Sequence, residues 1–191
     1  MPTALRLRPP GRYQHQDELE RFVRFCQERG VRRYLEIGSR WGESFYAVMA
    51  NLPVPSFGMS IDLPENEEKA QSLMGTAAEL RGLGHDILTM LYDSRSKEAA
   101  AVAKLNGPYD LVFIDGDHTY AGVSADWTDY HWLAPIVALH DVSAPDTWMS
   151  DGKPNGVGRF WRDLNAEGGF RESIEFITPS DRPMGYGIVV R

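Results

Sequence analysis

The stretch that decides the fold reads Tyr34-Leu35-Glu36-Ile37-Gly38-Ser39-Arg40-Trp41-Gly42-Glu43-Ser44-Phe45. An apolar run that begins near Val31 predicts a short buried strand, and apolar residues with helical spacing follow Gly42. The glycines at 38 and 42 let the backbone approach a ligand closely. A helix that begins at such a loop adds free N–H groups and a partial positive charge. The strand, glycine turn and helix together predict a seat for a nucleotide-like ligand.

The spacing of the glycines distinguishes between kinds of nucleotide. The dinucleotide fingerprint is G-x-G-x-x-G, whereas this chain reads Glu36-x-Gly38-x-x-x-Gly42-x-Ser44. The tight pyrophosphate turn is missing, which disfavours a nicotinamide-dependent dehydrogenase. The pattern resembles the first motif of class I S-adenosylmethionine-dependent methyltransferases, in which the loop cradles the methionine half of the cofactor. The resemblance implies cofactor contacts from Glu36, Gly38, Ser39, Gly42 and Ser44, although such a turn can also be purely structural.

Length and composition bound the class of protein. The 191 residues suit one domain with one good core, so we expect a single domain over residues 1–191 with an N-terminal arm over residues 1–14. The chain has 20 Lys and Arg against 27 Asp and Glu, a net charge of −7, which argues mildly against nucleic acid as a partner.

The single cysteine, Cys26, excludes an internal disulfide and fits a reducing compartment. It falls on the apolar stripe of a predicted helix over residues 17–29, where we expect it to pack in the core. No apolar run reaches the length of a membrane span, and the first eight residues contain no signal-peptide core. We therefore expect a soluble, cytoplasmic protein without a membrane partner. Monomer and homo-oligomer both remain open.

Apolar strands and amphipathic helices alternate along the chain. The expected strands are residues 31–37, 57–61, 87–91, 111–114 and 136–139, with a terminal pair at 174–177 and 188–190. Further helices are expected after Gly42 and over residues 65–81, 120–132 and 157–164, with an alanine-rich helix ending before Gly107. This rhythm predicts an α/β, three-layer Rossmann-like fold with a mostly parallel seven-stranded sheet and an antiparallel hairpin at its edge.

Five successive strands end at a glycine or an acidic residue. These residues are Gly38, Asp62, Asp93, Asp115 and Asp141. Because ligands bind beyond the carboxyl ends of strands in an open parallel sheet, all five are expected on one rim. Asp62 can accept hydrogen bonds from both ribose hydroxyls of an adenosine, or it can cap the next turn. Asp93 and Ser94 would flank the adenine, unless Ser94 only caps the alanine-rich helix.

The densest polar cluster is Asp115-Gly116-Asp117-His118-Thr119-Tyr120 together with His140-Asp141 on the next strand. Asp115 and Asp141 end adjacent strands in this arrangement and lie close enough to share a cation. Oxygen ligands suit Mg²⁺, and His140 as a third ligand shifts the preference toward Mn²⁺. In the alternative, Asp117 and His118 only cap a helix and His140 packs.

The segments Phe113–Tyr120 and Leu139–Asp141, with Asp126 between them, carry a second resemblance. They look like a small-molecule methyltransferase family related to macrolide-sugar O-methyltransferases and cephalosporin-hydroxylase-like proteins, and more distantly like catechol O-methyltransferase. The resemblance covers roughly residues 34–142. It implies a divalent metal held by Asp115, His140 and Asp141, and it implies that His118 serves as the base. His140 departs from the carboxylate usual at its position, and Ala134-Pro135 replaces a Gly-Gly turn.

These features predict an S-adenosylmethionine-dependent methyltransferase that methylates a hydroxyl of a small metabolite with the help of a divalent metal. His118 and Asp115 are the predicted catalytic residues, with His118 taking the proton. The long loop over residues 143–156, with Trp148 and Met149, is expected to cover the acceptor. The alternative is a cofactor-binding protein without turnover that acts in regulation or assembly. The acceptor itself is not specified.

Overall fold

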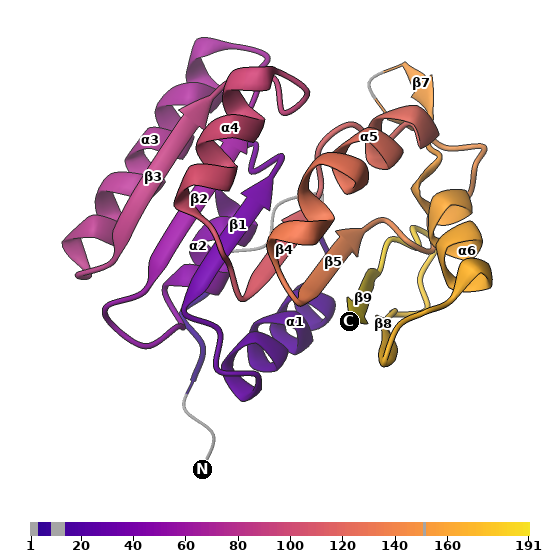
Figure 1. Cartoon of the computed structure of the whole chain (residues 1–191), viewed down its shortest axis with the longest axis horizontal. Helices are drawn as coiled ribbons and strands as arrows, with labels where there is room; N and C mark the ends of the chain where they lie inside the picture. The colour runs from indigo at the N-terminus through magenta and orange to yellow at the C-terminus, as the bar shows by residue number, and fades with distance from the viewer. Residues whose placement is uncertain (1–3, 9–13, 151) are drawn as a thin grey trace.

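The computed structural model describes residues 4–8, 14–150 and 152–191. A sheet in the order β3-β2-β1-β4-β5-β9-β8 runs through the molecule (Figure 1). Its strands are β1 (Arg33–Ile37), β2 (Phe57–Asp62), β3 (Asp86–Leu91), β4 (Leu111–Ile114), β5 (Ile136–His140), β8 (Glu172–Phe176) and β9 (Tyr186–Val190). The helices are α1 (Gln16–Glu28), α2 (Glu43–Met49), α3 (Glu67–Gly82), α4 (Lys97–Asn106), α5 (Tyr120–Tyr130), η1 (His131–Leu133) and α6 (Val157–Glu167).

The strand directions agree with the predicted fold. The first five strands are parallel, and the register places Leu35 of β1 beside Met59 of β2 and Val112 of β4. The hairpin β8–β9 joins the sheet through β9, which runs antiparallel to β5. The prediction of a mostly parallel seven-stranded sheet with an antiparallel edge hairpin is therefore confirmed.

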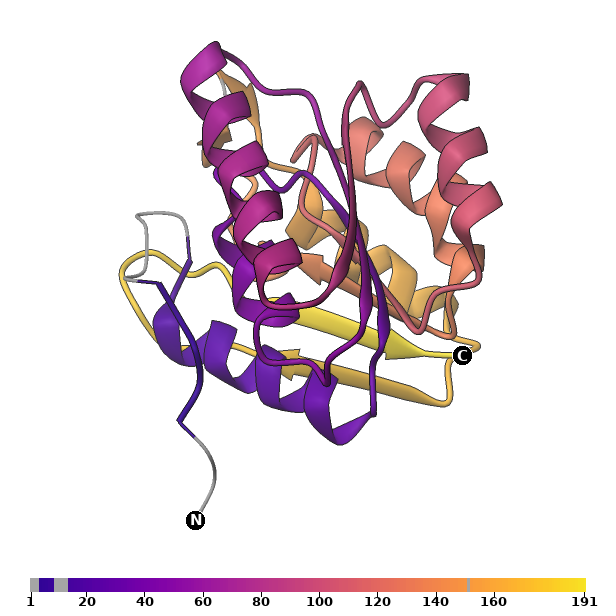
Figure 2. The same ribbon diagram turned by 90° about the vertical axis from the view of Figure 1, so that its left-hand side faces the viewer.

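Helices cover both faces of the sheet and give the molecule three layers. Tyr34 packs in the hydrophobic cluster that contains residues of α1, α2 and α3, and its neighbour Leu35 packs in the cluster that contains residues of α4, α5 and α6. Side chains of a strand alternate between faces, so one apolar strand supplies both cores. Figure 2 shows the indigo and purple helices on one side of the strands and the pink and orange helices on the other.

Several boundaries differ from the predicted ones. Helix α3 begins at Glu67 because the Asn66 side chain accepts a hydrogen bond from the Lys69 amide, so Glu65 lies before the helix. The long loop over residues 143–156 contains a small ribbon of β6 (Met149–Ser150) and β7 (Lys153–Pro154) that was not predicted. Isolated pairs of two residues carry no periodicity from which a strand could be recognised.

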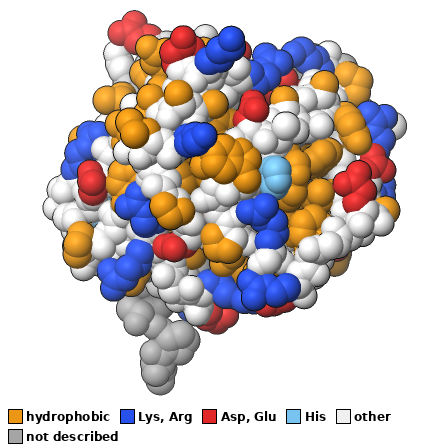
Figure 3. All heavy atoms as spheres, in the orientation of Figure 1, with side chains coloured by type: hydrophobic (Ala, Val, Ile, Leu, Met, Phe, Trp, Pro, Cys, Tyr) orange, Lys and Arg blue, Asp and Glu red, His pale blue; other side chains and the backbone are white. Residues whose placement is uncertain are grey.

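The predicted N-terminal arm lies partly outside the described residues, because residues 1–3 and 9–13 are not described. Leu5 and Leu7 pack against the core on the side of α1 to α3. Cys26 is fully buried in the same core, as predicted from its place on the apolar face of the first helix. No helix among the described residues combines the length and apolar character needed to cross a bilayer. On the face shown in Figure 3, basic and acidic side chains are interspersed with apolar and neutral ones.

Candidate active site

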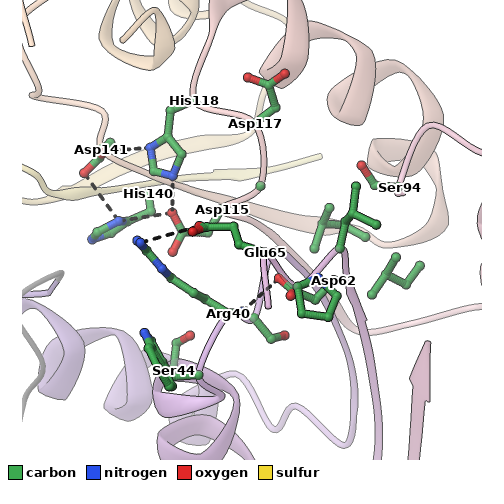
Figure 4. A pocket seen from close by; sticks show the side chains of 18 of the residues that line it. Arg40, Ser44, Asp62, Glu65, Ser94, Asp115, Asp117, His118, His140 and Asp141 are labelled. Carbon is green, nitrogen blue, oxygen red and sulfur yellow. Dashed lines mark hydrogen bonds and ion pairs between the residues drawn. The ribbon is translucent and has the colours of Figure 1, made fainter. Parts of the chain in front are cut away.

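A pocket of about 530 Å³ opens beyond the carboxyl ends of the parallel strands. All five predicted strand-end residues line it: Gly38, Asp62, Asp93, Asp115 and Asp141. Ser39, Ser44, Ser94, His118 and His140 line the same pocket. In Figure 4, the side chains of Asp115, His118, His140 and Asp141 lie together, away from Ser94. The topology thus brings together residues that are far apart in the sequence.

The glycine loop, residues 38–42, connects β1 to α2 with a shape that requires its glycines. Gly38 has φ +86°, and a Cβ added there would lie 2.2 Å from the backbone oxygen of Asp115. Gly42 has φ +84° and abuts Thr76 of α3. Gly38 therefore allows β1 and β4 to approach at the pocket, whereas Gly42 allows the loop to pack on α3. Gly38 is among the pocket-lining residues, and Gly42 is not.

Glu36 lies beneath the glycine loop and is fully buried. Its carboxylate accepts hydrogen bonds from Tyr34 Oη at 2.5 Å and Ser44 Oγ at 2.8 Å. Burial raises the pKa of Glu36 to about 7, against the lowering effect of these hydrogen bonds. Glu36 is not among the described residues that line the pocket. The structure thus gives Glu36 a supporting position beneath the loop, where its carboxylate accepts from β1 and α2 and does not line the pocket.

Asp62 ends β2 and faces the pocket with its Oδ1 accepting the backbone N–H of Arg40 at 2.9 Å. Burial raises the pKa of this carboxyl. Asp62 therefore lines the pocket, and its hydrogen bond fastens the glycine loop rather than the turn that follows Asp62.

The segment after β3 forms another wall. Asp93 accepts the Arg95 amide at 2.9 Å, and this bond lowers the pKa of Asp93. Ser94 Oγ donates to Asp126 Oδ1 at 2.6 Å. The cap of α4 is Ser96, so the alternative in which Ser94 caps that helix is wrong.

The histidine–aspartate cluster consists of Asp115, His118, His140 and Asp141 (Figure 4). His118 Nδ1 lies 2.8 Å from Asp141 Oδ2, and His118 Nε2 lies 3.6 Å from Asp115 Oδ1. His140 Nδ1 lies 3.2 Å from Asp115 Oδ1 and 3.4 Å from Asp141 Oδ1. Each imidazole is thus placed between the same two carboxylates. Asp141 has φ +61°, in the left-handed region that residues with a side chain rarely adopt.

The close packing of opposite charges determines how the cluster titrates. Burial alone would lower the pKa of His118, but the hydrogen bond to Asp141 and the charges of Asp115 and Asp141 outweigh it and raise the pKa. Burial is outweighed in the same way at His140, where the charges of Asp115 and Asp141 raise the pKa to about 9. For Asp141, burial is outweighed by His140 and His118, which hold its pKa at about 2.

The donor set of the cluster also tests the predicted metal site. Within residues 4–8, 14–150 and 152–191, no three His, Cys, Asp or Glu side chains are grouped so that they could hold one metal ion. His140 Nδ1 stands between the carboxylates of Asp115 and Asp141, where a shared cation was expected. The predicted Mg²⁺ or Mn²⁺ site at these three residues is therefore not formed by the side chains as they stand.

Asp117 stabilises the start of α5 and is not part of the histidine–aspartate cluster. Its Oδ1 accepts the Thr119 amide at 2.9 Å, and Thr119 is the cap of α5. The capping alternative is thus right for Asp117. It is wrong for His118, whose ring bonds Asp141.

Several pocket residues were not found from the sequence. Asn155 Nδ2 donates to Asp141 Oδ2 at 3.0 Å, and the Gly156 amide donates to the His118 carbonyl at 2.8 Å, so the loop over residues 143–156 is fastened to the cluster. Trp148 lines the pocket, as expected of this loop; the side chain of Met149 lies outside the described part. Leu63 and Tyr92 adjoin the predicted strand-end residues, and Lys153 lies in the same long loop. More distant segments contribute Gln14, Arg182 and Met184. An Asn-Gly pair after a long loop was the one signal that could have indicated Asn155.

Comparison with known proteins places this architecture in a family. A methyltransferase-domain family model matches residues 35–142, more than half of the chain. The chain therefore belongs to this family of methyltransferases. A search of curated protein sequences found no match.

Solved structures of O-methyltransferases share the fold. The O-methyltransferase TomG from Streptomyces achromogenes, involved in tomaymycin synthesis and solved with SAM, is 19% identical with a TM-score of 0.68, over 93% of this chain and 80% of that one. An O-methyltransferase from Bacillus cereus, solved with SAH, is 18% identical with a TM-score of 0.70; the match covers 95% of this chain and 84% of that one. Magnesium protoporphyrin IX methyltransferase from Synechocystis PCC 6803, with bound SAM, is 17% identical with a TM-score of 0.65; the match covers 93% of this chain and 79% of that one. By family and fold the chain is a class I S-adenosylmethionine-dependent methyltransferase, as its sequence predicted.

Proposed function

We propose that the chain transfers the methyl group of S-adenosylmethionine to a hydroxyl oxygen of a small molecule, with His118 as the base. The observation that carries this proposal is the hydrogen bond between His118 and Asp141 inside the pocket that the glycine loop and Asp62 also line. The strand-end residues that we assign to the cofactor and the histidine that we assign as the base thus line one cavity, and the histidine is held by Asp141.

The cofactor is assigned to the wall formed by β1, β2 and β3. Gly38, Ser39 and Ser44 lie at the end that we assign to the methionine half. Asp62 is assigned to the ribose hydroxyls, because its carboxylate is held in one orientation by the Arg40 amide. Asp93 and Ser94 follow β3 on the same wall and are assigned to the adenine. These assignments are supported by the position of each residue after its strand.

His118 is suited to take a proton at Nε2. A carboxylate can only accept hydrogen bonds, so the bond to Asp141 places the ring proton on Nδ1 and leaves the lone pair of the neutral ring on Nε2. Asp141 is itself held by Asn155. This support fixes both the tautomer and the orientation of His118, as a catalytic imidazole requires.

The proposed reaction is an in-line displacement. A lone pair of the acceptor oxygen forms the bond to the methyl carbon, the carbon–sulfur bond breaks with its electron pair on sulfur, and the hydroxyl proton passes to His118 Nε2. The products are the methyl ether and S-adenosylhomocysteine. Trp148 and Arg182 line the pocket on segments separate from the cofactor wall, so we assign the acceptor to their side. The metal assistance predicted from the sequence is not part of this proposal, and none of these steps uses it.

The proposal is tested with purified protein in two measurements. Calorimetry is expected to show binding of S-adenosylhomocysteine, and incubation with S-adenosylmethionine and a panel of phenols, sugars and hydroxy acids is expected to release S-adenosylhomocysteine with at least one acceptor class. His118→Gln should lower kcat by about 10²–10⁴-fold, because it removes the base, and should leave the cofactor Kd within about twofold.

The matched control is His131→Gln. His131 stacks on Trp127, its Nδ1 lies 2.7 Å from the Trp127 carbonyl, and it is not a pocket residue, so its loss should leave kcat unchanged. Absence of binding at millimolar S-adenosylhomocysteine would disprove the proposal. If S-adenosylhomocysteine binds but none of the acceptor classes is methylated, the cofactor-binding alternative is favoured.

A further inference from the structure

Asp126 of α5 is a buried carboxylate that the proposed reaction does not use. Its side chain is 1% exposed. Oδ1 accepts the Ser94 hydroxyl at 2.6 Å, and Oδ2 is buried without a hydrogen-bond partner among the described residues. Burial raises the pKa of Asp126 to about 6, so the carboxylate is ionised in mildly alkaline solution. A charge placed in the interior against a single hydroxyl indicates a role for that hydroxyl.

Helix α5 holds Ser94 at two points. Asp126 accepts from the Ser94 side chain, and Tyr130 Oη, one turn further along the helix, donates to the Ser94 carbonyl. The next residues are fixed as well, since Asp93 accepts the Arg95 amide. Ser94 therefore lies in the pocket wall with both its backbone and its hydroxyl restrained.

The hydrogen bond to Asp126 determines whether the Ser94 hydroxyl acts as a donor or an acceptor toward a ligand. A serine hydroxyl has one hydrogen to donate and two lone pairs that accept. An ionised carboxylate accepts only, so the hydroxyl hydrogen is committed to Asp126 in a charge-assisted bond. Toward the pocket, Ser94 Oγ then presents lone pairs alone. A ligand group beside it must be a donor, because an acceptor there would face lone pairs without a hydrogen between them.

The surroundings of Ser94 suit a planar apolar ring. Leu63 follows β2 and is 64% exposed, and Tyr92 follows β3 and is 50% exposed. Both line the pocket beside the ends of two adjacent strands. Large apolar side chains left open at a pocket mouth, next to one oriented polar atom, are typical of a site that binds an aromatic ring and reads one of its edges.

We propose that Asp126 sets the polarity of the Ser94 hydroxyl, so that the pocket selects a purine with an amino group at C6 over one with a keto oxygen there. This inference rests on the proposed function, which assigns the adenine to the wall containing Ser94. Asp126 acts through Ser94 and is a positioning residue that determines specificity for the base.

The test compares two ligands that differ at the base. Calorimetric Kd values are measured at pH 8 for S-adenosylhomocysteine and for S-inosylhomocysteine, its deaminated form with a keto oxygen at C6. The wild-type protein is expected to prefer the adenine form by about ten- to a hundredfold, the range expected when a polar group loses its partner. The ratio of the two Kd values is the readout, because a merely structural change weakens both ligands together.

Three variants sharpen the test. Ser94→Ala removes the oriented oxygen and should bring the ratio to within about threefold of one. Asp126→Asn keeps the volume of the side chain but can donate its amide to Ser94, which frees the hydroxyl hydrogen for a keto oxygen; the ratio should fall at least about fivefold. Asp129→Asn removes a neighbouring carboxylate of the same helix, which makes no hydrogen bond to Ser94, and should leave the ratio unchanged.

The outcomes separate this inference from the proposed function. If the wild-type protein binds neither ligand, the proposed function fails. If it binds S-adenosylhomocysteine but Ser94→Ala and Asp126→Asn keep the wild-type ratio, the inference is wrong while the proposed function stands. An equal loss of affinity for both ligands in Asp126→Asn, with the ratio preserved, would likewise overturn it and leave Asp126 a role in folding only.

Discussion

The glycine loop and the histidine–aspartate cluster lie in one pocket, but they are built differently. The loop is one continuous stretch between β1 and α2, and its support from Glu36 and Ser44 lies within a few residues of it. The cluster joins the ends of β4 and β5, and it depends on Asn155 from a separate loop. The glycine loop is therefore a property of a local motif, whereas the proposed base is positioned by contacts between distant segments.

The largest effect is expected from breaking the loop. Gly38→Ala forces a residue with a side chain into φ +86° and places its Cβ 2.2 Å from the Asp115 oxygen. The backbone strain alone is about 1–3 kcal/mol, and the clash also separates β1 from β4. We expect a lower thermal midpoint and at least about a 100-fold loss of S-adenosylhomocysteine affinity, measured by differential scanning fluorimetry and calorimetry.

Gly75→Ala is the matched control for this variant. Gly75 lies inside α3 with no atom within 4 Å of an added Cβ, so alanine should stabilise the helix by about 0.5–1 kcal/mol. Unchanged cofactor affinity in Gly38→Ala would show that the loop does not bind the cofactor.

A smaller effect should appear in the pH dependence of the rate. His118 accepts a proton only when neutral, and its pKa is raised above the ordinary value of 6.5. At low pH the ring is protonated and the rate is low; kcat should rise with pH through an inflection above 6.5, with about a tenfold loss per pH unit below it. The inflection belongs to the coupled cluster.

Asp141→Asn sharpens the pH experiment, because it removes one of the two negative charges that raise the pKa of His118 and replaces a carboxylate, which only accepts, by an amide, which can also donate. Its inflection should move to lower pH, and its kcat should fall because the ring tautomer is no longer held. A flat wild-type profile between pH 5.5 and 9.5 would argue against His118 as the base.

The smallest effect is expected on removing metal ions. Because His140 Nδ1 lies between the carboxylates of Asp115 and Asp141, dialysis against EDTA should change kcat by less than about twofold. His140→Glu would replace this imidazole with a third carboxylate and should bind Mn²⁺ at least about tenfold more tightly, as measured by electron paramagnetic resonance of free Mn²⁺. A wild-type rate that is lost in EDTA and restored by Mg²⁺ would contradict this expectation.

Much of the pocket could be predicted because it depends on repeating geometry. The apolar runs predicted strands, and parallel strands end on one edge, so Asp62, Asp93, Asp115 and Asp141 were expected together and do line one pocket. Pairings across the fold could not be predicted in this way. The bond between Ser94 and Asp126 joins residues 32 positions apart; the sequence interpretation placed Ser94 beside the adenine or at a helix cap and gave no partner for its hydroxyl.

The metal prediction shows the same limit at shorter range. Two aspartates and a histidine at adjacent strand ends have the composition of a metal site, and composition was all that the sequence offered. Whether the imidazole stands beside the carboxylates or between them is set by how the two strand ends pack together, which composition does not encode.

The sequence by itself determined the sheet, its covering helices and the edge at which polar residues collect, because periodicity and strand direction are local and additive. The tertiary structure alone decided which hydrogen-bond donor pairs with which acceptor in the pocket. Those pairings arise when packing brings α5 to Ser94 and Asn155 to Asp141, and no local pattern encodes such contacts.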